Sequence, residues 1–272
     1  MMRAPFVAGV LALMTRALEH HQWSAGASSV MRIVATDYAF TVSSLPRAGL
    51  VTVRLVNHGR EMHHLAISRV PNDLSLRRYY ELATAGQPSS LIHDLGGPNL
   101  TAPADSSEVT LQLPLGRYIL TCWVSATDGT PHIMRGMMAE VRLAQRATAS
   151  PTPAAAVRIS ASDYSFAIDG HLRAGTNTIV FENAGPQEHD IQFLRLLPGQ
   201  SAAAIAEWAN KGGVGAPTPA VIGGSSGIDQ GRRVWFTLTL RPGRYLLVCF
   251  VPDVRDGKMH LLHGMLREIT VS

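Results

Sequence analysis

The chain has 272 residues, of which 46% are hydrophobic and 16% charged, so it can bury a sizeable core and is not an intrinsically disordered sequence. Its 24 glycines and 16 prolines suit a fold rich in strands and turns. The net charge of +4 comes from scattered arginines, since Lys211 and Lys258 are the only lysines, and no basic run interleaved with aromatic residues predicts nucleic-acid binding.

The first 29 residues are expected to form an N-terminal extension or a signal segment. Arg3 precedes an apolar stretch over residues 6–14, and the small residues 25–27 offer a cleavage site. The spacer between these features is long and polar for a signal peptide, because it contains Arg16, Glu19 and the pair His20-His21. No apolar run reaches the ~18–20 residues needed to span a bilayer. The segment favours export to the periplasm or outside the cell, and an uncleaved extension is the alternative.

The first half of the remaining chain has the pattern of β-strands with one helix. Alternating or continuous apolar segments predict strands over residues 51–56, 109–113, 118–124 and 138–143. The run over 118–124 is almost wholly apolar, as expected of a central strand packed on both faces. A helix is expected over residues 74–84, with Asn72-Asp73 supplying a plausible N-cap.

The second half follows a stretch of small residues and prolines over 147–154, which has no periodicity and predicts a linker. Beyond it, strands are predicted over residues 177–181, 234–240, 245–251 and 266–271. A helix is expected over residues 202–210 after the N-cap residue Ser201.

The two halves share motifs at a nearly constant offset. The offset is 126 residues from Asp37 to Asp163 and only 128 from Met137 to Met265. The repeated motifs are DYxF at 37–40 and 163–166, NxG at 57–59 and 183–185, and GRY at 116–118 and 243–245. We interpret this pattern as a tandem duplication of one domain. Short strands at such spacing, with one inserted helix in each copy, predict an all-β fold of two tandem Greek-key β-sandwiches, over residues 30–146 and 155–272.

Each half carries four potential metal ligands in the same order, namely His, Cys, His and Met. They are His63, Cys122, His132 and Met137 in the first half, and His189, Cys249, His260 and Met265 in the second. Nine residues separate the cysteine from the second histidine in the first half, and ten do so in the second. Both halves then read His-x4-Met, with a glycine before the methionine.

These residue types in this order predict copper as the cofactor of one or both domains. Two imidazoles and one thiolate form a trigonal donor set, to which a thioether at longer range adds a weak axial ligand. Soft sulfur donors favour Cu(I), whereas imidazole accepts Cu(II), so such a site passes an electron with little rearrangement. The cysteine at a strand end and the His and Met of the next loop would lie at one side of the sandwich, where a neighbouring loop supplies the other histidine.

The motifs that carry these residues are NHGREMHH (57–64), GRYILTC (116–122) and HIMRGM (132–137), followed by NAGPQEH (183–189), GRYLLVC (243–249) and HLLHGM (260–265). They resemble those of the cupredoxins, the blue or type 1 copper proteins. The resemblance covers nearly the whole chain after residue 30 and implies two copper-binding β-sandwiches. The loop from cysteine to histidine is longer than in small electron-transfer cupredoxins and is similar to that of two-domain copper nitrite reductases.

Each of these residues alone has an ordinary structural interpretation. A lone buried cysteine is usually a small core hydrophobe, and a lone Gly-Met pair usually packs. A disulfide between Cys122 and Cys249 is not expected, because they hold equivalent positions in separate domains and a disulfide needs Cα atoms ~4.4–6.8 Å apart. His64 is expected to face away from the site, since adjacent strand residues point to opposite faces. His263 is a candidate extra donor or proton route in the second domain.

Three classes of function fit the sequence. The first is a copper-binding protein for electron transfer or copper handling, with a redox partner protein and no catalytic site of its own. The second is a two-domain copper oxidoreductase, resembling nitrite reductases or small multicopper oxidases, whose additional copper needs further histidines; the chain has no His-x-His pair. The third is a metal-free β-sandwich that binds a partner. No GxSxG elbow, P-loop or GxGxxG unit supports hydrolase or nucleotide chemistry. We expect the first class, and the oligomeric state stays open.

Overall fold

The computed structural model describes residues 29–85, 89–211 and 220–272. The predicted N-terminal segment, with its cleavage site and the His20-His21 pair, lies outside the described residues. Within the described ranges, neither α-helix is long and apolar enough to cross a membrane.

The first β-sandwich contains strands β1 to β8 and one α-helix. Strands β2, β1, β3 and β6 lie side by side in one sheet, and β5, β4, β7 and β8 form the facing sheet. The bounds are β1 Ser29–Thr36, β2 Ala39–Ser44, β3 Gly49–Asn57, β4 Ala66–Val70, β5 His93–Asp94, β6 Ser106–Leu113, β7 Gly116–Thr121 and β8 Met138–Leu143, with helix α1 at Leu76–Thr84 and the 3-10 helix η1 at His132–Arg135.

The second β-sandwich has the same order of strands in its two sheets. Strands β10, β9, β11 and β14 form one sheet, and β13, β12, β15 and β16 form the other. The bounds are β9 Val157–Ser162, β10 Ser165–Asp169, β11 Gly175–Asn183, β12 His189–Arg195, β13 Ala220–Ile228, β14 Arg233–Leu240, β15 Gly243–Val248 and β16 Leu266–Val271, with helix α2 at Ala202–Asn210 and the 3-10 helix η2 at His260–His263. The predicted all-β fold of two tandem sandwiches, each with one short helix, is confirmed.

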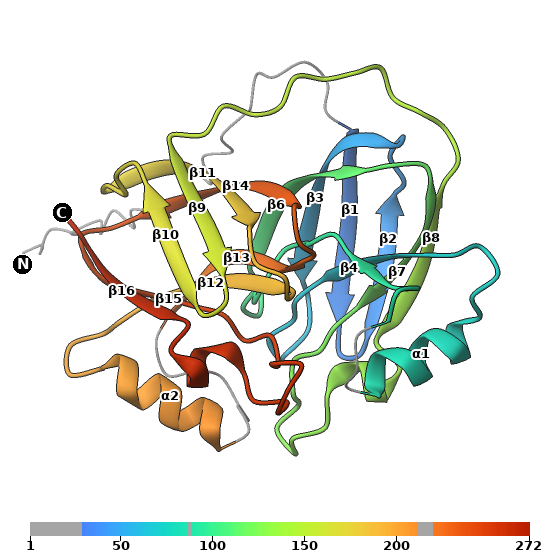
Figure 1. The fold of residues 1–272 in the computed structure, drawn as a ribbon. Coiled ribbons are helices and arrows are strands. Elements are labelled where there is room, and N and C mark those ends of the chain that lie inside the picture. Colours follow the sequence, from blue (N-terminus) through green and yellow to red (C-terminus); the bar gives the residue numbers. More distant parts are fainter. Residues whose placement is uncertain (1–28, 86–88, 212–219) are drawn as a thin grey trace, which may run out of the picture.

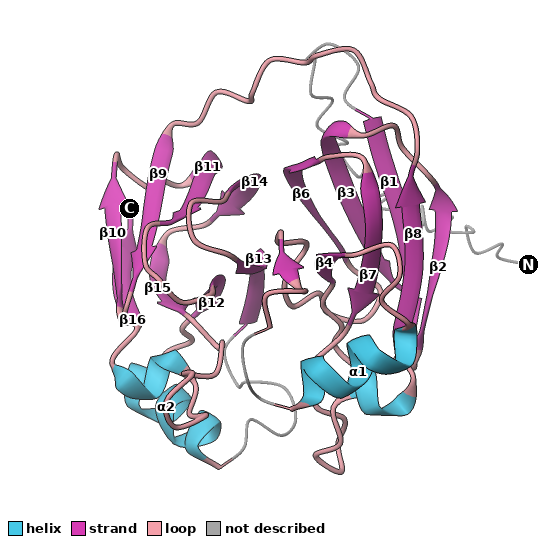
Figure 2. Cartoon of the chain, turned by 45° about the vertical axis from the view of Figure 1, so that its right-hand side comes forward, coloured by secondary structure: helices cyan, strands magenta, loops and turns pink. Residues whose placement is uncertain are grey.

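The two sandwiches are joined through a common sheet. Strand β14 pairs with β6 in the antiparallel sense, so that Val234 lies opposite Leu111 and Trp235 opposite Thr110. The result is one eight-stranded sheet in the order β10-β9-β11-β14-β6-β3-β1-β2. Figures 1 and 2 show the sandwiches side by side, with the connection from β8 to β9 passing over one end of the molecule and both α-helices at the other.

A second contact between the domains is made by the segment over residues 95–101, which follows β5. Its residues Leu95 and Pro98 form isolated β-bridges with Ile228 and Ser225 of strand β13. The sandwiches are therefore connected in both layers, by β6 with β14 and by this segment with β13.

Helix α2 has the predicted bounds, and the Ser201 hydroxyl accepts a hydrogen bond from the Ala204 N–H at 3.3 Å. Helix α1 begins at Leu76, two residues later than predicted. Its N-cap is Ser75, whose hydroxyl accepts the Arg78 N–H at 3.1 Å, and not the pair Asn72-Asp73. The Asn72 side chain is used elsewhere, because its carbonyl oxygen accepts a hydrogen bond from Arg142 at 2.6 Å.

Candidate metal centres

The loops at one end of each four-stranded sheet bring the predicted ligands together. In the first domain His63 lies shortly before β4, Cys122 directly follows β7, and His132 begins η1, which leads to Met137 and β8. The second domain places His189 at the start of β12, Cys249 directly after β15, and His260 at the start of η2. Residues distant in the sequence thus meet because their strands are neighbours in one sheet.

Strands β7 and β15 end at Thr121 and Val248, earlier than the predicted ends at residues 124 and 251. The chain leaves the sheet because the peptide groups of Cys122 bond to the following loop. The Cys122 N–H donates to the carbonyl of Met137 at 3.3 Å, and the Cys122 carbonyl accepts the Ile133 N–H at 2.8 Å. These bonds hold the ligand loop against the cysteine.

In the first domain three donor atoms form a compact, fully buried triangle. The Nδ1 atoms of His63 and His132 are 3.1 Å apart. The Sγ atom of Cys122 lies 3.4 Å from Nδ1 of His132 and 3.9 Å from Nδ1 of His63. All three side chains are inaccessible to solvent. The two histidines therefore present the same ring nitrogen toward the thiol.

The second domain contains a triangle of nearly the same dimensions. The Nδ1 atoms of His189 and His260 are 3.1 Å apart. The Sγ atom of Cys249 lies 3.5 Å from Nδ1 of His260 and 3.9 Å from Nδ1 of His189. Both cysteines are free thiols, so no disulfide joins the domains. Each triangle is a group of side chains able to hold one metal ion.

The methionines of the predicted sets, Met137 and Met265, are fully buried next to these triangles. The Met137 N–H donates to the carbonyl of His132 at 3.0 Å, and its carbonyl accepts the N–H of Cys122 at 3.3 Å. The two equivalent bonds of Met265 measure 3.0 and 3.2 Å. Each methionine is thus fixed by its main chain to two members of the triangle.

The triangles have the dimensions that one first-row metal ion requires. Bond lengths of about 2.0 Å to nitrogen and about 2.3 Å to sulfur give edges of about 3.5 Å between nitrogens and about 3.7 Å between nitrogen and sulfur in a trigonal plane. The observed edges, from 3.1 to 3.9 Å, are close to these values in both domains. Two imidazoles and one thiolate with a nearby thioether are the donor set of type 1 copper sites.

Burial keeps the donor groups of both triangles neutral, so a metal ion that binds there must displace the thiol proton. Burial raises the pKa of the Cys122 thiol to about 12 and that of Cys249 well above its usual value. Both thiols therefore hold their protons unless a buried positive charge compensates the thiolate. Burial lowers the pKa of the imidazoles, to about 4 for His260, so these rings are neutral at pH 7 and their Nδ1 lone pairs are available to a metal.

Carboxylates orient the first histidine of each site through Nε2, the ring nitrogen that is not part of the triangle. The Nε2 atoms of His63 and His189 lie 2.8 Å from the carboxylates of Asp37 and Asp163, the two equivalent aspartates of the DYxF motifs. An Nε2–H that donates to a carboxylate leaves Nδ1 as the bare nitrogen, which fixes the tautomer needed for metal binding. Burial acts to raise the pKa of Asp37, but hydrogen bonds from the Arg60 N–H and from His63 outweigh it and lower that pKa.

The second histidines differ in their partners. His132 Nε2 lies 2.7 Å from the carboxylate of Glu61. In the second domain the equivalent of Glu61 is Gln187, whose carbonyl oxygen is 3.4 Å from His260 Nε2. The two sites therefore have nearly equal donor triangles. His132 has a carboxylate at hydrogen-bond distance, whereas His260 has an amide at 3.4 Å and the carboxylate of Asp253 only at 3.8 Å.

We expect Asp37→Asn to weaken copper binding in the first domain by about 10–100-fold, the range found when a partner behind a ligating histidine is lost. The substitution removes the charge that fixes the His63 ring, whose Nε2 lies 2.8 Å away. Titration with a competing chelator measures the affinity of each site. Asp169→Asn, at an exposed position of β10, is the matched control and should leave both affinities unchanged. Equal affinities in Asp37→Asn and in the unaltered protein would contradict this role.

His64 lies outside the first triangle, as expected, and supports it in another way. Its main-chain N–H points to Cys122 Sγ at 3.5 Å, and its ring Nε2 accepts the N–H of Trp123 at 2.8 Å. In the second domain Asp190 is the residue that corresponds to His64. Its N–H points to Cys249 Sγ at 3.4 Å, and its carboxylate accepts the N–H of Phe250 at 2.8 Å.

His263 is not part of the second triangle. Its Nε2 lies 3.1 Å from the carboxylate of Asp256, and with Asp253 these residues form a third group of potential ligands within the described part of the chain. Both Asp253 oxygens already accept hydrogen bonds, from Tyr164 and from Arg255 among others. The group therefore forms a hydrogen-bonded network at the rim of the second site.

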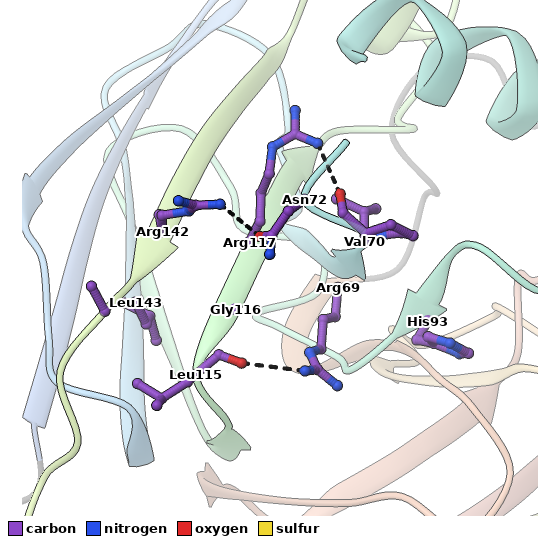
Figure 3. Close-up of a pocket in the computed structure, with 11 residues that line it drawn as sticks. Arg69, Val70, Asn72, His93, Leu115, Gly116, Arg117, Arg142 and Leu143 are labelled. Atoms are coloured by element: carbon purple, nitrogen blue, oxygen red, sulfur yellow. Dashed lines mark hydrogen bonds between the residues drawn. The ribbon is translucent and has the colours of Figure 1, made fainter. Parts of the chain in front are cut away.

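The first domain has a cavity of about 520 Å³, and Arg69, Arg117 and Arg142 are among the residues that line it (Figure 3). It lies where β4 and β8 end and β7 begins, at the opposite end of this sheet from the donor triangle. The guanidinium groups of Arg69 and Arg142 bond to the Leu115 carbonyl and to Asn72, and that of Arg117 pairs with Glu140. The cavity is therefore separate from the candidate metal centres.

The sequence alone assigns no role to the carboxylates and amides behind the histidines. In the sequence Asp37 and Asp163 are only members of a repeated motif, although their constant offset is the signal that could have identified them. Glu61 and Gln187 share the same offset of 126 residues but differ in type, so the repeat alone does not mark them. Their roles follow only from their distances to the Nε2 atoms.

No protein-family model matches the chain, and neither does any curated protein. Among solved structures, auracyanin from the photosynthetic bacterium Roseiflexus castenholzii is 24% identical, with 42% of this chain and 94% of that chain covered and a TM-score of 0.32. A Cu-containing nitrite reductase from Thermus scotoductus SA-01 is 13% identical. The match covers 90% of this chain and 62% of the reductase chain, with a TM-score of 0.26. Copper nitrite reductase from Nitrosomonas europaea is 13% identical. The match covers 90% of this chain and 94% of the reductase chain, with a TM-score of 0.26. These similarities are low, so the assignment of the sites depends on their donor geometry.

Proposed function

We infer that this chain is a tandem two-domain cupredoxin, which transfers electrons and binds copper through two histidines, a cysteine and a methionine in one or both domains. The observation that carries this proposal is the pair of buried donor triangles with nearly identical edges. The proposed ligands are His63, Cys122, His132 and Met137 in the domain over residues 30–146, and His189, Cys249, His260 and Met265 in the domain over residues 155–272.

The arrangement suits electron transfer because the protein side of each site is already in place. Copper bound there supplies a centre that exchanges one electron between Cu(I) and Cu(II). The carboxylates behind His63 and His189 hold the imidazoles in one tautomer, and the main-chain bonds of Cys122 and Met137 fix the loop. Full burial of the donors excludes water as an additional ligand. A site with fixed donors changes little between oxidation states.

The direct test is titration of the purified protein with Cu(II), with visible absorption and bound copper measured together. We expect an intense visible band, up to two copper ions per chain, and reversible bleaching by a one-electron reductant. Bleaching and recovery distinguish electron transfer from copper storage. No band and no tightly bound copper would contradict the proposal and would favour the metal-free β-sandwich.

Copper affinity should rise with pH by about tenfold per unit between about pH 7 and 9, with one proton released for each site filled. In this interval the imidazoles are already neutral, because burial lowers their pKa. The thiols are still protonated, since burial raises the pKa of Cys122 to about 12. Calorimetric titration in two buffers of different ionisation enthalpy measures the protons released. A flat pH dependence would mean that the thiols do not bind the metal.

We also propose that the protein works in the periplasm or outside the cell with a redox partner protein. The charged and apolar pattern of residues 3–14, followed by small residues at 25–27, supports export. The N-terminal sequence of the mature protein, isolated from its source, tests this proposal. An intact N-terminus together with recovery in the cytoplasmic fraction would contradict it.

A further inference from the structure

The two candidate centres are connected by a chain of hydrogen bonds that crosses the domain boundary. Its middle member is Asn99, which lies in the segment between the domains and is 1% exposed. The Asn99 Nδ2 donates to the Asp190 carboxylate at 3.2 Å. On its other side, the carbonyl of Pro98, the residue before Asn99, accepts the N–H of Leu65 at 2.9 Å, and Leu65 directly follows His64. His64 and Asp190 are the two residues whose N–H groups point to the cysteine sulfurs.

Every link of this chain is a covalent bond or a hydrogen bond. The His64 N–H points to Cys122 Sγ, and the N–H of Leu65, the next residue, donates to the Pro98 carbonyl. The Asn99 amide nitrogen then donates to Asp190. The other carboxylate oxygen of Asp190 accepts the N–H of Phe250, the residue after Cys249. None of the groups along this hydrogen-bonded path has to gain or lose a proton for the path to be complete.

Additional bonds hold the central amide in one orientation. The Asn99 Nδ2 is also 3.2 Å from the carbonyl oxygen of Ile191 and 3.0 Å from that of Ser225, both in the second domain. The Asn99 Oδ1 accepts the N–H of Leu100 at 2.9 Å. A buried amide with all its groups bonded is rigid, because each alternative orientation would leave polar groups unsatisfied.

We propose that the two centres exchange electrons within one molecule, along the chain Cys122–His64–Leu65–Pro98–Asn99–Asp190–Cys249. Covalent and hydrogen bonds couple donor and acceptor orbitals better than gaps between packed atoms do. One electron leaves the reduced centre and enters the oxidised one, so the exchange is balanced and needs no further reactant. This proposal rests on the proposed function, because both sites must hold copper.

Pulse radiolysis of the protein with two copper ions bound tests the exchange. All samples carry Met137→Leu, which removes one axial thioether and gives the two centres different visible bands. A substoichiometric pulse of electrons reduces the centres in a bimolecular phase. We expect a second phase whose rate does not depend on protein concentration, as electrons redistribute inside each molecule. This phase should vanish when Cys249→Ser leaves only one centre.

Variants at the boundary between the two domains then test which residues the electron path uses. Asn99→Leu, which keeps the size of the side chain but cuts the chain of hydrogen bonds, should slow the second phase several-fold without changing either visible band. Asn99→Ser provides the same test if the leucine variant does not fold. The matched control is Ser226→Ala, because the buried Ser226 hydroxyl donates across the same boundary to the Leu65 carbonyl at 2.8 Å and is not in the chain. It should leave the rate unchanged.

The outcomes separate this proposal from the one it rests on. Fewer than two copper ions per chain, counted before any pulse, would overturn both. Two bound copper ions without a concentration-independent phase would overturn the exchange alone. A second phase that is as fast in both Asn99 variants as in their parent, or that slows equally in Ser226→Ala, would overturn the assigned path.

Discussion

Cys122→Ser is expected to remove one of two bound copper ions and about half of the visible absorption, and Cys249→Ser to remove the other. The thiolate is the donor that gives a type 1 site its intense band, and a serine hydroxyl does not replace it as a soft ligand. Serine is close to cysteine in size, so the buried position can accept it without a large cavity. The Cys122→Ser, Cys249→Ser double variant should have no band. Absorption spectra and copper analysis of the three variants check these results.

The methionines provide a matched pair for the same measurement. Met137 is fully buried beside the triangle, whereas Met134 lies in η1 with half of its surface exposed. Met137→Leu should shift the band or the potential of the first site, and Met134→Leu should change neither. Retention of the full band in both cysteine variants would contradict thiolate ligation in either domain.

Copper is expected to stabilise the folded protein by about 4 kcal/mol per site when its free concentration is about 1,000 times the dissociation constant. Binding to the native triangle but not to the unfolded chain shifts the equilibrium toward folding. Because the donors already lie within 3.9 Å of one another, the metal should add stability without changing the secondary structure. Denaturant unfolding of Cys249→Ser, with and without copper under anaerobic conditions, isolates the first site.

The control for this measurement is the double cysteine variant, whose unfolding free energy should not respond to copper. Circular dichroism should give the same spectrum for the copper-loaded and copper-free forms of Cys249→Ser. Equal unfolding midpoints with and without copper would show that the metal does not bind the native first site more strongly than the unfolded chain.

The sequence predicted the class of fold and half of the strands of the described residues because the relevant signals are local. Alternating apolar residues located β6 and β14, and Ser201 located the start of α2. The start of α1 was missed by two residues since three candidate caps, at positions 72, 73 and 75, precede it. Which of them caps the helix depends on a tertiary contact, the bond from Arg142 to Asn72, and no local pattern encodes that contact.

The contacts between the domains could not be predicted for the same reason. The pairing of β6 with β14 involves few residues, and an edge strand that pairs with another domain has the same alternation as one that faces solvent. Asn99 belongs to no repeated motif, and its role depends on the Asp190 side chain of β12 and on main-chain carbonyls of β12 and β13. The order His, Cys, His and Met indicated which residues gather in each half, but not which groups lie behind them.

Because one chain forms both sandwiches of the common sheet, their pairing does not depend on the protein concentration. Two separate sandwiches that paired through β6 and β14 would dissociate on dilution, and each would then expose an unpaired strand, which is a site for aggregation. The connection over residues 144–156 makes this pairing intramolecular, so the pairing does not weaken when the protein is diluted. The chain therefore has the organisation of a dimer whose subunits cannot be diluted apart, and β2 and β10 are the outermost strands of its long sheet.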